Sequence, residues 1–115
     1  MKPGDVGHVN ANGLSTLAED RAEARAIREV LGDVPVTAPK SLFGNLGSGT
    51  GAVELAASLL AFEHGLVPAT RNYEYPDPDC PVNVIHGKPL AGAASTAILV
   101  NRWHMGQSVA IVVAK

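Results

Sequence analysis

The sequence predicts an α/β fold, a mixed sheet with helices packed on it, and three observations lead to this class. Short apolar segments alternate with two segments of helical periodicity over the first 64 residues. Three β-rich segments follow an extended, proline-rich connection. The predicted order is therefore β-α-β-α-β-β-β. At 115 residues the chain is suited to a single globular domain, which we expect to span residues 1–115.

The first strand and the first helix are predicted at residues 6–11 and 18–32. The short segment "VGHVNA" carries valines at positions 6 and 9, and the Asn-Gly turn of Asn12 and Gly13 ends this strand. In "AEDRAEARAIREVLG" the apolar residues recur at helical spacing, while charged residues cover the other face. Gly32 is predicted to end the helix.

The second strand and the second helix are predicted at residues 34–39 and 52–64. "VPVTAP" is typical of a brief buried strand, and a glycine-rich segment at residues 44–51 leads into the helix. This helix is apolar almost all round, with Glu54 and Glu63 as its only acidic residues. We therefore expect residues 52–63 to form the most buried helix, in the interior or against a partner.

The rest of the chain is predicted to be an extended connection followed by strands. Residues 66–81 form the connection, and residues 82–87, 96–101 and 108–114 are β-rich. The last two segments are hydrophobic enough for central strands. Because these segments are very apolar for so small a unit, we expect another chain to cover a large hydrophobic face, which predicts an oligomer.

Composition argues against several classes of partner and site. The net charge is −2 with dispersed basic residues, so neither nucleic acid nor an anionic membrane is an expected partner. No apolar run approaches the roughly 18 residues of a membrane span, and the N-terminus lacks the apolar core of a signal peptide. We therefore expect a cytoplasmic protein. Cys80 is the only cysteine, and its acidic, proline-rich surroundings indicate a loop residue rather than a nucleophile.

The remaining polar residues do not form a recognisable ligand set. The histidines do not have the spacing of metal ligands, and we expect each to be exposed or hydrogen-bonded; they are His8, His64, His86 and His104. Ser15 and Ser41 have no histidine at the spacing of a nucleophile and its base. No metal and no cofactor is therefore expected.

Two features near the second strand could bind an anion. Backbone N–H groups of the glycine-rich segment could hold one at the helix N-terminus, although Thr50 occupies the position where a phosphate-binding loop requires lysine. Alternatively, these glycines allow close packing of the helix. Lys40, at the end of the strand, either orients a carboxylate or a substrate anion or is a solvated strand end.

Four segments together resemble the C-terminal region of β-ketoacyl-[acyl-carrier-protein] synthases of the type that elongates fatty acids. They are "VNANGLST", residues 20–70, "NYEYPDPDCPVNVIHGKP" and "ILVNRWHMGQ". The resemblance implies the C-terminal part of a thiolase-like fold. Chains of this family are several times longer, and their cysteine nucleophile lies in a part that this sequence does not include.

The resemblance also marks the positions of the active site. The family has a histidine that binds the malonyl thioester where this chain has Asn12, and a second histidine where it has Asn45, whereas Lys40 is retained. The family's last loop, N-S-F-G-F-G-G, supplies a backbone N–H to the oxyanion hole; here it reads "NRWHMGQ", with Met105 and Gly106 at its substrate-binding positions. We expect Asn12, Lys40 and Asn45 to converge on one polar site.

These differences predict a subunit that is not catalytic alone. Related enzymes use asparagine at the position of Asn45, but Asn12 leaves no imidazole, and one oxyanion donor is typically worth about 2.7–4 kcal/mol. The implied function is that of a ketosynthase-like partner in fatty acid or polyketide biosynthesis, comparable to a chain-length factor. Its expected partners are a ketosynthase-like chain or a second copy, with an acyl carrier protein as a further one.

Two alternatives remain open. The chain could be a split half of an active 3-oxoacyl synthase whose cysteine comes from another chain. A weaker alternative is a module that binds a small ligand through residues 44–51.

Overall fold

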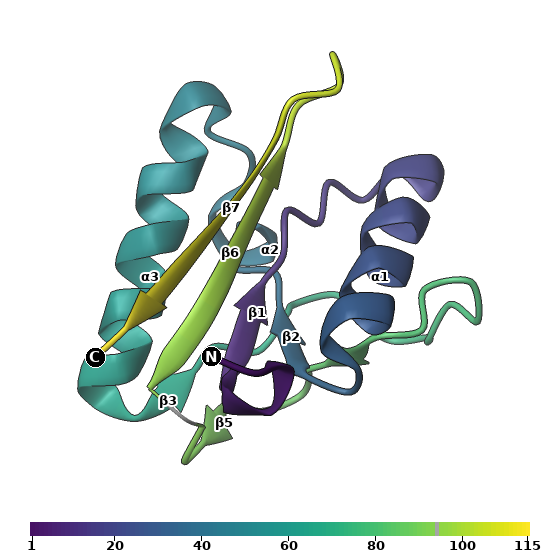
Figure 1. Cartoon of the computed structure of the whole chain (residues 1–115). Coiled ribbons are helices and arrows are strands. Elements are labelled where there is room, and N and C mark those ends of the chain that lie inside the picture. The colour runs from purple at the N-terminus through teal and green to yellow at the C-terminus, as the bar shows by residue number, and fades with distance from the viewer. Residues whose placement is uncertain (94) are drawn as a thin grey trace.

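The computed structural model describes residues 1–93 and 95–115, and a five-stranded mixed sheet lies at its centre (Figure 1). In spatial order its strands are β4 (Asn83–Val84), β2 (Pro35–Thr37), β1 (His8–Asn10), β6 (Thr96–Arg102) and β7 (Ser108–Ala114). The first four are parallel, while β7 runs antiparallel to β6. The predicted α/β class with a mixed sheet is confirmed.

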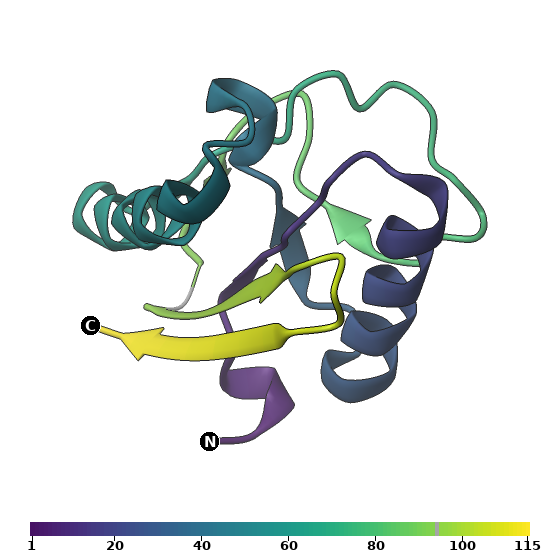
Figure 2. The ribbon, with the colours of Figure 1, turned by 90° about the horizontal axis from the view of Figure 1, so that it is seen from above.

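Two long helices cover opposite faces of this sheet. The view in Figure 2 shows α1 (Leu17–Leu31) on one side of it and α3 (Thr50–His64) on the other. The shorter elements are η1 (Pro3–Asp5), α2 (Lys40–Phe43), η2 (Gly47–Gly49), β3 (Leu66–Val67) and β5 (Leu90–Ala91). No helix in the described parts of the chain has the length and apolar character needed to cross a bilayer.

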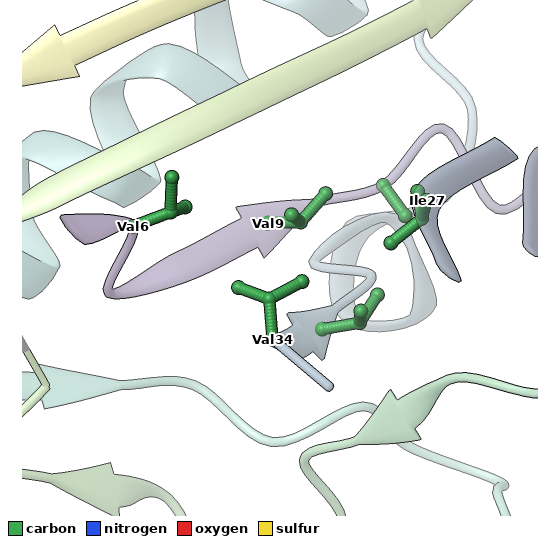
Figure 3. Packing of buried hydrophobic residues seen from close by; sticks show 6 residues of the cluster. Val6, Val9, Ile27 and Val34 are labelled. Carbon is green, nitrogen blue, oxygen red and sulfur yellow. The ribbon is translucent and has the colours of Figure 1, made fainter. Parts of the chain in front are cut away.

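The face of the sheet beneath α1 carries a hydrophobic core. Its buried members are Val6, Val9, Ala11, Ile27, Val34 and Val36 (Figure 3). Strand side chains alternate between faces, so Val9 faces this core while His8 and Asn10 face α3. α1 ends where predicted, because Gly32 adopts a φ of 70° and its N–H donates to the carbonyl of Arg28.

Residues 52–63 lie in α3, which has more buried residues than the other described helices, as predicted, but one side of α3 is open in this chain. The side of α3 that packs on the sheet is largely polar, with Thr50, Glu54 and Ser58 buried. Leu59 and Leu60 on the other side are 48% and 52% exposed. The reason is that polar groups of the sheet hydrogen-bond the polar side of α3, so its apolar side faces outward.

The prediction of two central strands at the end of the chain is half right. β6 lies between β1 and β7, and Ala97 and Leu99 are buried, whereas β7 is an edge strand. The Val109 and Val112 side chains of β7 are 55% and 52% exposed. Composition could not show which of the two strands is central and which is at the edge, because both kinds of strand can carry the same apolar residues.

Two local predictions also need correction. The connection at residues 66–81 is not wholly extended loop, because β3 pairs antiparallel with β5. Lys40 does not end a strand but begins α2. In both cases the sequence lacks a local signal, since the pairing partner is distant and α2 is a single helical turn.

Candidate functional site

Asn12 lies in the loop that leaves β1 and is nearly buried, at 5% exposure. Its backbone N–H and that of Gly13 donate to the two carboxylate oxygens of Glu23, at 2.7 and 2.9 Å. Gly13 has a φ of +47°, and a Cβ atom there would lie 2.9 Å from the Ala38 Cβ. Only glycine therefore suits this turn.

Lys40 contacts Asn12 directly, although the two residues come from different strand-to-helix connections. Its Nζ donates to the Asn12 carbonyl oxygen, to Asn12 Oδ1 at 3.2 Å and to Glu54 Oε1 at 2.8 Å. The contact follows from the sheet, because β1 and β2 are parallel neighbours and their carboxyl ends meet at one edge. A lysine ammonium has three N–H donors, and these three acceptors account for all of them.

Glu54 completes this cluster from α3. Its side chain is fully buried, and its second carboxylate oxygen accepts a 3.0 Å hydrogen bond from Asn101 Nδ2 of β6. A buried carboxylate is tolerated only when it is paired and hydrogen-bonded, and here both conditions hold. The isolated acid in an apolar helix was the sequence signal that could have identified Glu54 as part of the site.

Asn45 lies nearby but does not bond to Asn12 or Lys40 within the described structure. It is exposed in the loop between α2 and η2, where its Oδ1 accepts hydrogen bonds from the Gly47 N–H at 3.0 Å and from Thr50 Oγ1 at 3.1 Å. Asn45 and Lys40 line the same cavity of about 460 Å³. The structure thus brings Asn12 and Lys40 into contact and places Asn45 on the wall of an adjoining cavity.

Met105 and Gly106 lie in the turn that joins β6 to β7. Met105 is 70% exposed, and the Gly106 N–H donates to the Trp103 carbonyl within the turn, at 2.9 Å. The end of β6 next to this turn contacts the site, because the Arg102 carbonyl accepts a 3.3 Å hydrogen bond from Asn12 Nδ2. Arg102 therefore links Asn12 to the turn that carries Met105 and Gly106.

A second polar cluster lies deeper along the interface between β1 and α3. Asn10 Nδ2 donates to the Glu54 carbonyl at 2.9 Å and to Ser58 Oγ at 3.1 Å, and His8 Nε2 lies 3.4 Å from the same Ser58 oxygen. Burial lowers the pKa of His8 from 6.5 to about 4, so this imidazole is neutral at neutral pH. Sequence reasoning missed this cluster, since nothing local shows that α3 packs through its polar side.

Burial also shifts two acidic groups near the first loop. It raises the pKa of Glu23, against the opposing effect of the hydrogen bonds from the Gly13 and Asn12 N–H groups. It raises the pKa of the Cys80 thiol as well, with Asp77 as a further cause. A raised pKa disfavours the thiolate, the form in which cysteine acts as a nucleophile.

The four histidines lie outside the cluster around Lys40. His64, His86 and His104 are exposed at the end of α3, in the loop after β4 and in the β6–β7 turn. His8 is buried, and its Nδ1 has no hydrogen-bond partner among the described residues. The expectation that every histidine would be exposed or satisfied therefore holds only partly for His8.

Comparisons with known proteins show which proteins this chain is similar to. The family described as β-ketoacyl synthase, C-terminal domain, matches residues 1–74. The tetracenomycin polyketide synthase ketoacyl synthase alpha subunit of Streptomyces glaucescens is 37% identical over 96% of this chain and 27% of its own. The 3-oxoacyl-[acyl-carrier-protein] synthase 2 of Synechocystis sp. is 34% identical over 100% of this chain and 29% of its own.

A solved structure, the ishigamide ketosynthase/chain length factor, superposes with a TM-score of 0.94 at 28% identity. The superposition covers 99% of this chain and 29% of the other. The present chain thus spans less than a third of the length of the relatives that it matches.

Proposed function

Since this chain belongs to the β-ketoacyl synthase family, with the C-terminal part of its thiolase-like fold, we propose that it is a non-catalytic ketosynthase-like subunit of fatty acid or polyketide biosynthesis. It acts beside a ketosynthase-like chain in the manner of a chain-length factor. We assign Asn12, Lys40 and Asn45 to the part of the candidate site that faces an acyl thioester. An acyl carrier protein is the proposed carrier of that thioester.

The observation that carries this proposal is the full engagement of the Lys40 ammonium. Its three protons are directed at Asn12 and Glu54, so Lys40 has no donor left for a substrate oxygen. Catalysis requires contacts that strengthen as charge develops in the transition state. A lysine held by a buried carboxylate instead stabilises the loop of Asn12.

The side chain of Asn12 is engaged as well. Its oxygen accepts from Lys40, and its nitrogen donates to the Arg102 carbonyl. An amide cannot exchange protons as an imidazole does, and none of the four histidines lies in this cluster. The cluster around Lys40 therefore has no imidazole for proton transfer.

The alternative of a split active half is favoured by one observation, the open apolar side of α3. Exposed residues on it include Val53, Leu59 and Leu60, which a complementary half would cover. Reconstitution distinguishes the two functions, because a split half produces condensation when mixed with a chain that carries the cysteine, whereas a non-catalytic subunit leaves catalysis to a complete partner.

The weaker alternative, a small ligand on residues 44–51, receives less support. Backbone donors of this segment are already engaged: the Leu46 N–H donates to Thr50 Oγ1, the Gly47 N–H donates to Asn45 Oδ1, and the Gly49 N–H donates to the Leu46 carbonyl. Fewer N–H groups remain to hold an anion.

The decisive experiment measures carbon dioxide release from malonyl-acyl carrier protein. We expect no turnover by the isolated chain and test Asn12→His/Asn45→His in parallel, with equilibrium binding of an acyl-carrier protein as a separate readout. Release by the double variant alone identifies the lost imidazoles as the cause. Robust turnover by the unaltered chain, abolished by Asn12→Ala, contradicts the proposal.

A further inference from the structure

A cavity of about 320 Å³ lies between α1 and the segment of residues 70–82. Its inner end reaches the hydrophobic core beneath α1, because Ala11, Ile27 and Val36 line the cavity and belong to that core. Its outer end reaches solvent, since Tyr75 also lines it and is 85% exposed. The cavity therefore runs from the surface into the core.

The walls of this cavity are mostly apolar. Besides the three core residues they include Ala24 of α1, Val82, and Val84 of β4. Protein interiors are close-packed and leave few voids larger than a water molecule, so an apolar space of this size favours a ligand with an apolar body. The volume lies at the lower end of the range for small-molecule sites, which is about 300–1,000 Å³. The ligand that fits is therefore small.

The charged residues that line the cavity within the described structure are all acidic, namely Asp20, Glu23 and Asp77. Both carboxylate oxygens of Glu23 accept N–H groups of the loop after β1, and Asp77 forms an ion pair with Arg21 at 3.8 Å. Asp20 Oδ1, in contrast, is buried and has no hydrogen-bond partner among the described residues. A buried carboxylate oxygen without a partner is costly, and an ammonium donor offsets this cost.

Cys80 also lines the cavity and shows that its surroundings are negative. Burial raises the pKa of this thiol, and the negative charges of Asp77 and Asp20 raise it further, although Arg21 has the opposite effect. The same two carboxylates favour a cation in the cavity and oppose a carboxylate or a phosphate. Charge therefore selects a cationic ligand.

We propose that this cavity binds a small amine, with the apolar body of the ligand between α1 and residues 70–82 and its ammonium group on Asp20. The segment that forms the outer wall is held against α1 before binding, because Arg21 forms a 2.9 Å ion pair with Asp79. A preformed wall lowers the ordering cost of binding. The two tyrosines of this segment also line the cavity and add aromatic contact area for the ligand.

This inference does not depend on the proposed function. Lys40 and Asn45 do not line this cavity, and an amine belongs to a different chemical class from an acyl thioester. The cavity shares Asp20 with the one beside Lys40, so amine binding is measured without a carrier protein and without a partner chain. The failure of one proposal therefore leaves the other standing.

A series of three ligands with the same body tests the selection by charge. Phenethylamine, phenylethanol and hydrocinnamate carry a cationic, a neutral and an anionic head on one phenylethyl group. NMR titration of the backbone amides measures their affinities and locates the bound ligand. We expect saturable binding of phenethylamine with shifts in residues 20–27 and 73–84, binding of the alcohol weaker by about tenfold or more, and no binding of the acid. No binding of the amine, equal affinity for all three ligands, or shifts confined to other residues overturns the proposal.

Two matched variants test the role of Asp20. Asp20→Asn keeps the shape of the side chain and removes its charge, so we expect phenethylamine to bind at least about tenfold more weakly and phenylethanol to bind unchanged. In the control Asp79→Asn, the carboxylate that pairs with Arg21 does not line the cavity. The amine should bind this control within about twofold of the unaltered chain, because salt screens an exposed charge. Thermal unfolding confirms the fold of each variant, and the ligand series needs no variant. Unchanged amine affinity in Asp20→Asn, or the same loss in both variants, overturns the proposal.

Discussion

Lys40 and Glu54 form an ion pair that is closed to solvent, with 2.8 Å between Nζ and Oε1 and exposures of 6% and 0%. The pair connects α2, at the end of β2, to α3 on the face of the sheet. Asn12, in the loop after β1, and Asn101 of β6 bond to this pair, so that one pair of charges connects four parts of the fold. Its loss should affect stability before it affects any chemistry.

We predict that Lys40→Met and Glu54→Leu each lower the free energy of unfolding by about 3–5 kcal/mol, because each leaves a buried charge without its partner. The double variant Lys40→Met/Glu54→Leu should lose clearly less than the sum of the single changes. Urea denaturation measures all three values. Additive losses would show that the pair is not coupled.

The pKa of His8 predicts a dependence of stability on pH. This pKa falls from 6.5 to about 4 on folding, so between these values the unfolded chain binds more protons than the folded one. The contribution of His8 to the free energy of unfolding is at its full value above pH 6.5. It decreases by about 3 kcal/mol as the pH falls to 4, since each unit of pKa difference corresponds to about 1.36 kcal/mol.

Replacing His8 removes this dependence. In the unaltered chain the His8 ring contacts Phe62 edge-on, with 5.8 Å between ring centres. The variant His8→Phe keeps an aromatic ring at this position. Chemical denaturation of both proteins between pH 4 and 6.5 should show a smaller decrease for the variant. Parallel curves would mean that the carboxyl groups alone cause the pH dependence.

Gly13 should tolerate alanine less well than Gly65 does. Both have positive φ angles, +47° and +67°, but only Gly13 has an atom in the way, the Ala38 Cβ at 2.9 Å. Gly65→Ala should cost about 1–2 kcal/mol from backbone strain alone, and Gly13→Ala should cost more because the clash adds to the strain. Thermal unfolding compares the two, and equal costs would contradict the crowding at Ala38.

The orientation of α3 predicts opposite effects at adjacent positions. Leu60 is 52% exposed and Ala61 is 5% exposed. Leu60→Gln should leave the stability of the isolated chain within about 0.5 kcal/mol, as is usual on a surface, whereas Ala61→Gln should cost more because it puts a polar group into a packed interface. Thermal unfolding checks both. The reverse order would mean that the apolar side of α3 faces the sheet.

Much of the fold could be predicted from the sequence because the signals are local. A short valine-containing segment ended by an Asn-Gly turn indicated β1, helical spacing indicated α1, and Gly32 marked the end of α1, where the positive φ suits glycine. The order of elements also indicated a mixed sheet. The motif positions of Asn12 and Lys40 followed from the resemblance, and their contact follows from the parallel pairing of β1 and β2.

The sequence by itself determined the α/β class and the family, and its resemblance to that family predicts the places where amides stand for imidazoles. Only the tertiary structure decided which side of α3 is buried, because that choice depends on Asn10, Lys40 and Asn101 meeting Glu54 and Ser58 across the interface. It also decided that β7 is an edge strand and that Lys40 has no free donor. Each of these depends on contacts between residues far apart in the chain, and the free energy of burying a polar group depends on whether such a partner is present.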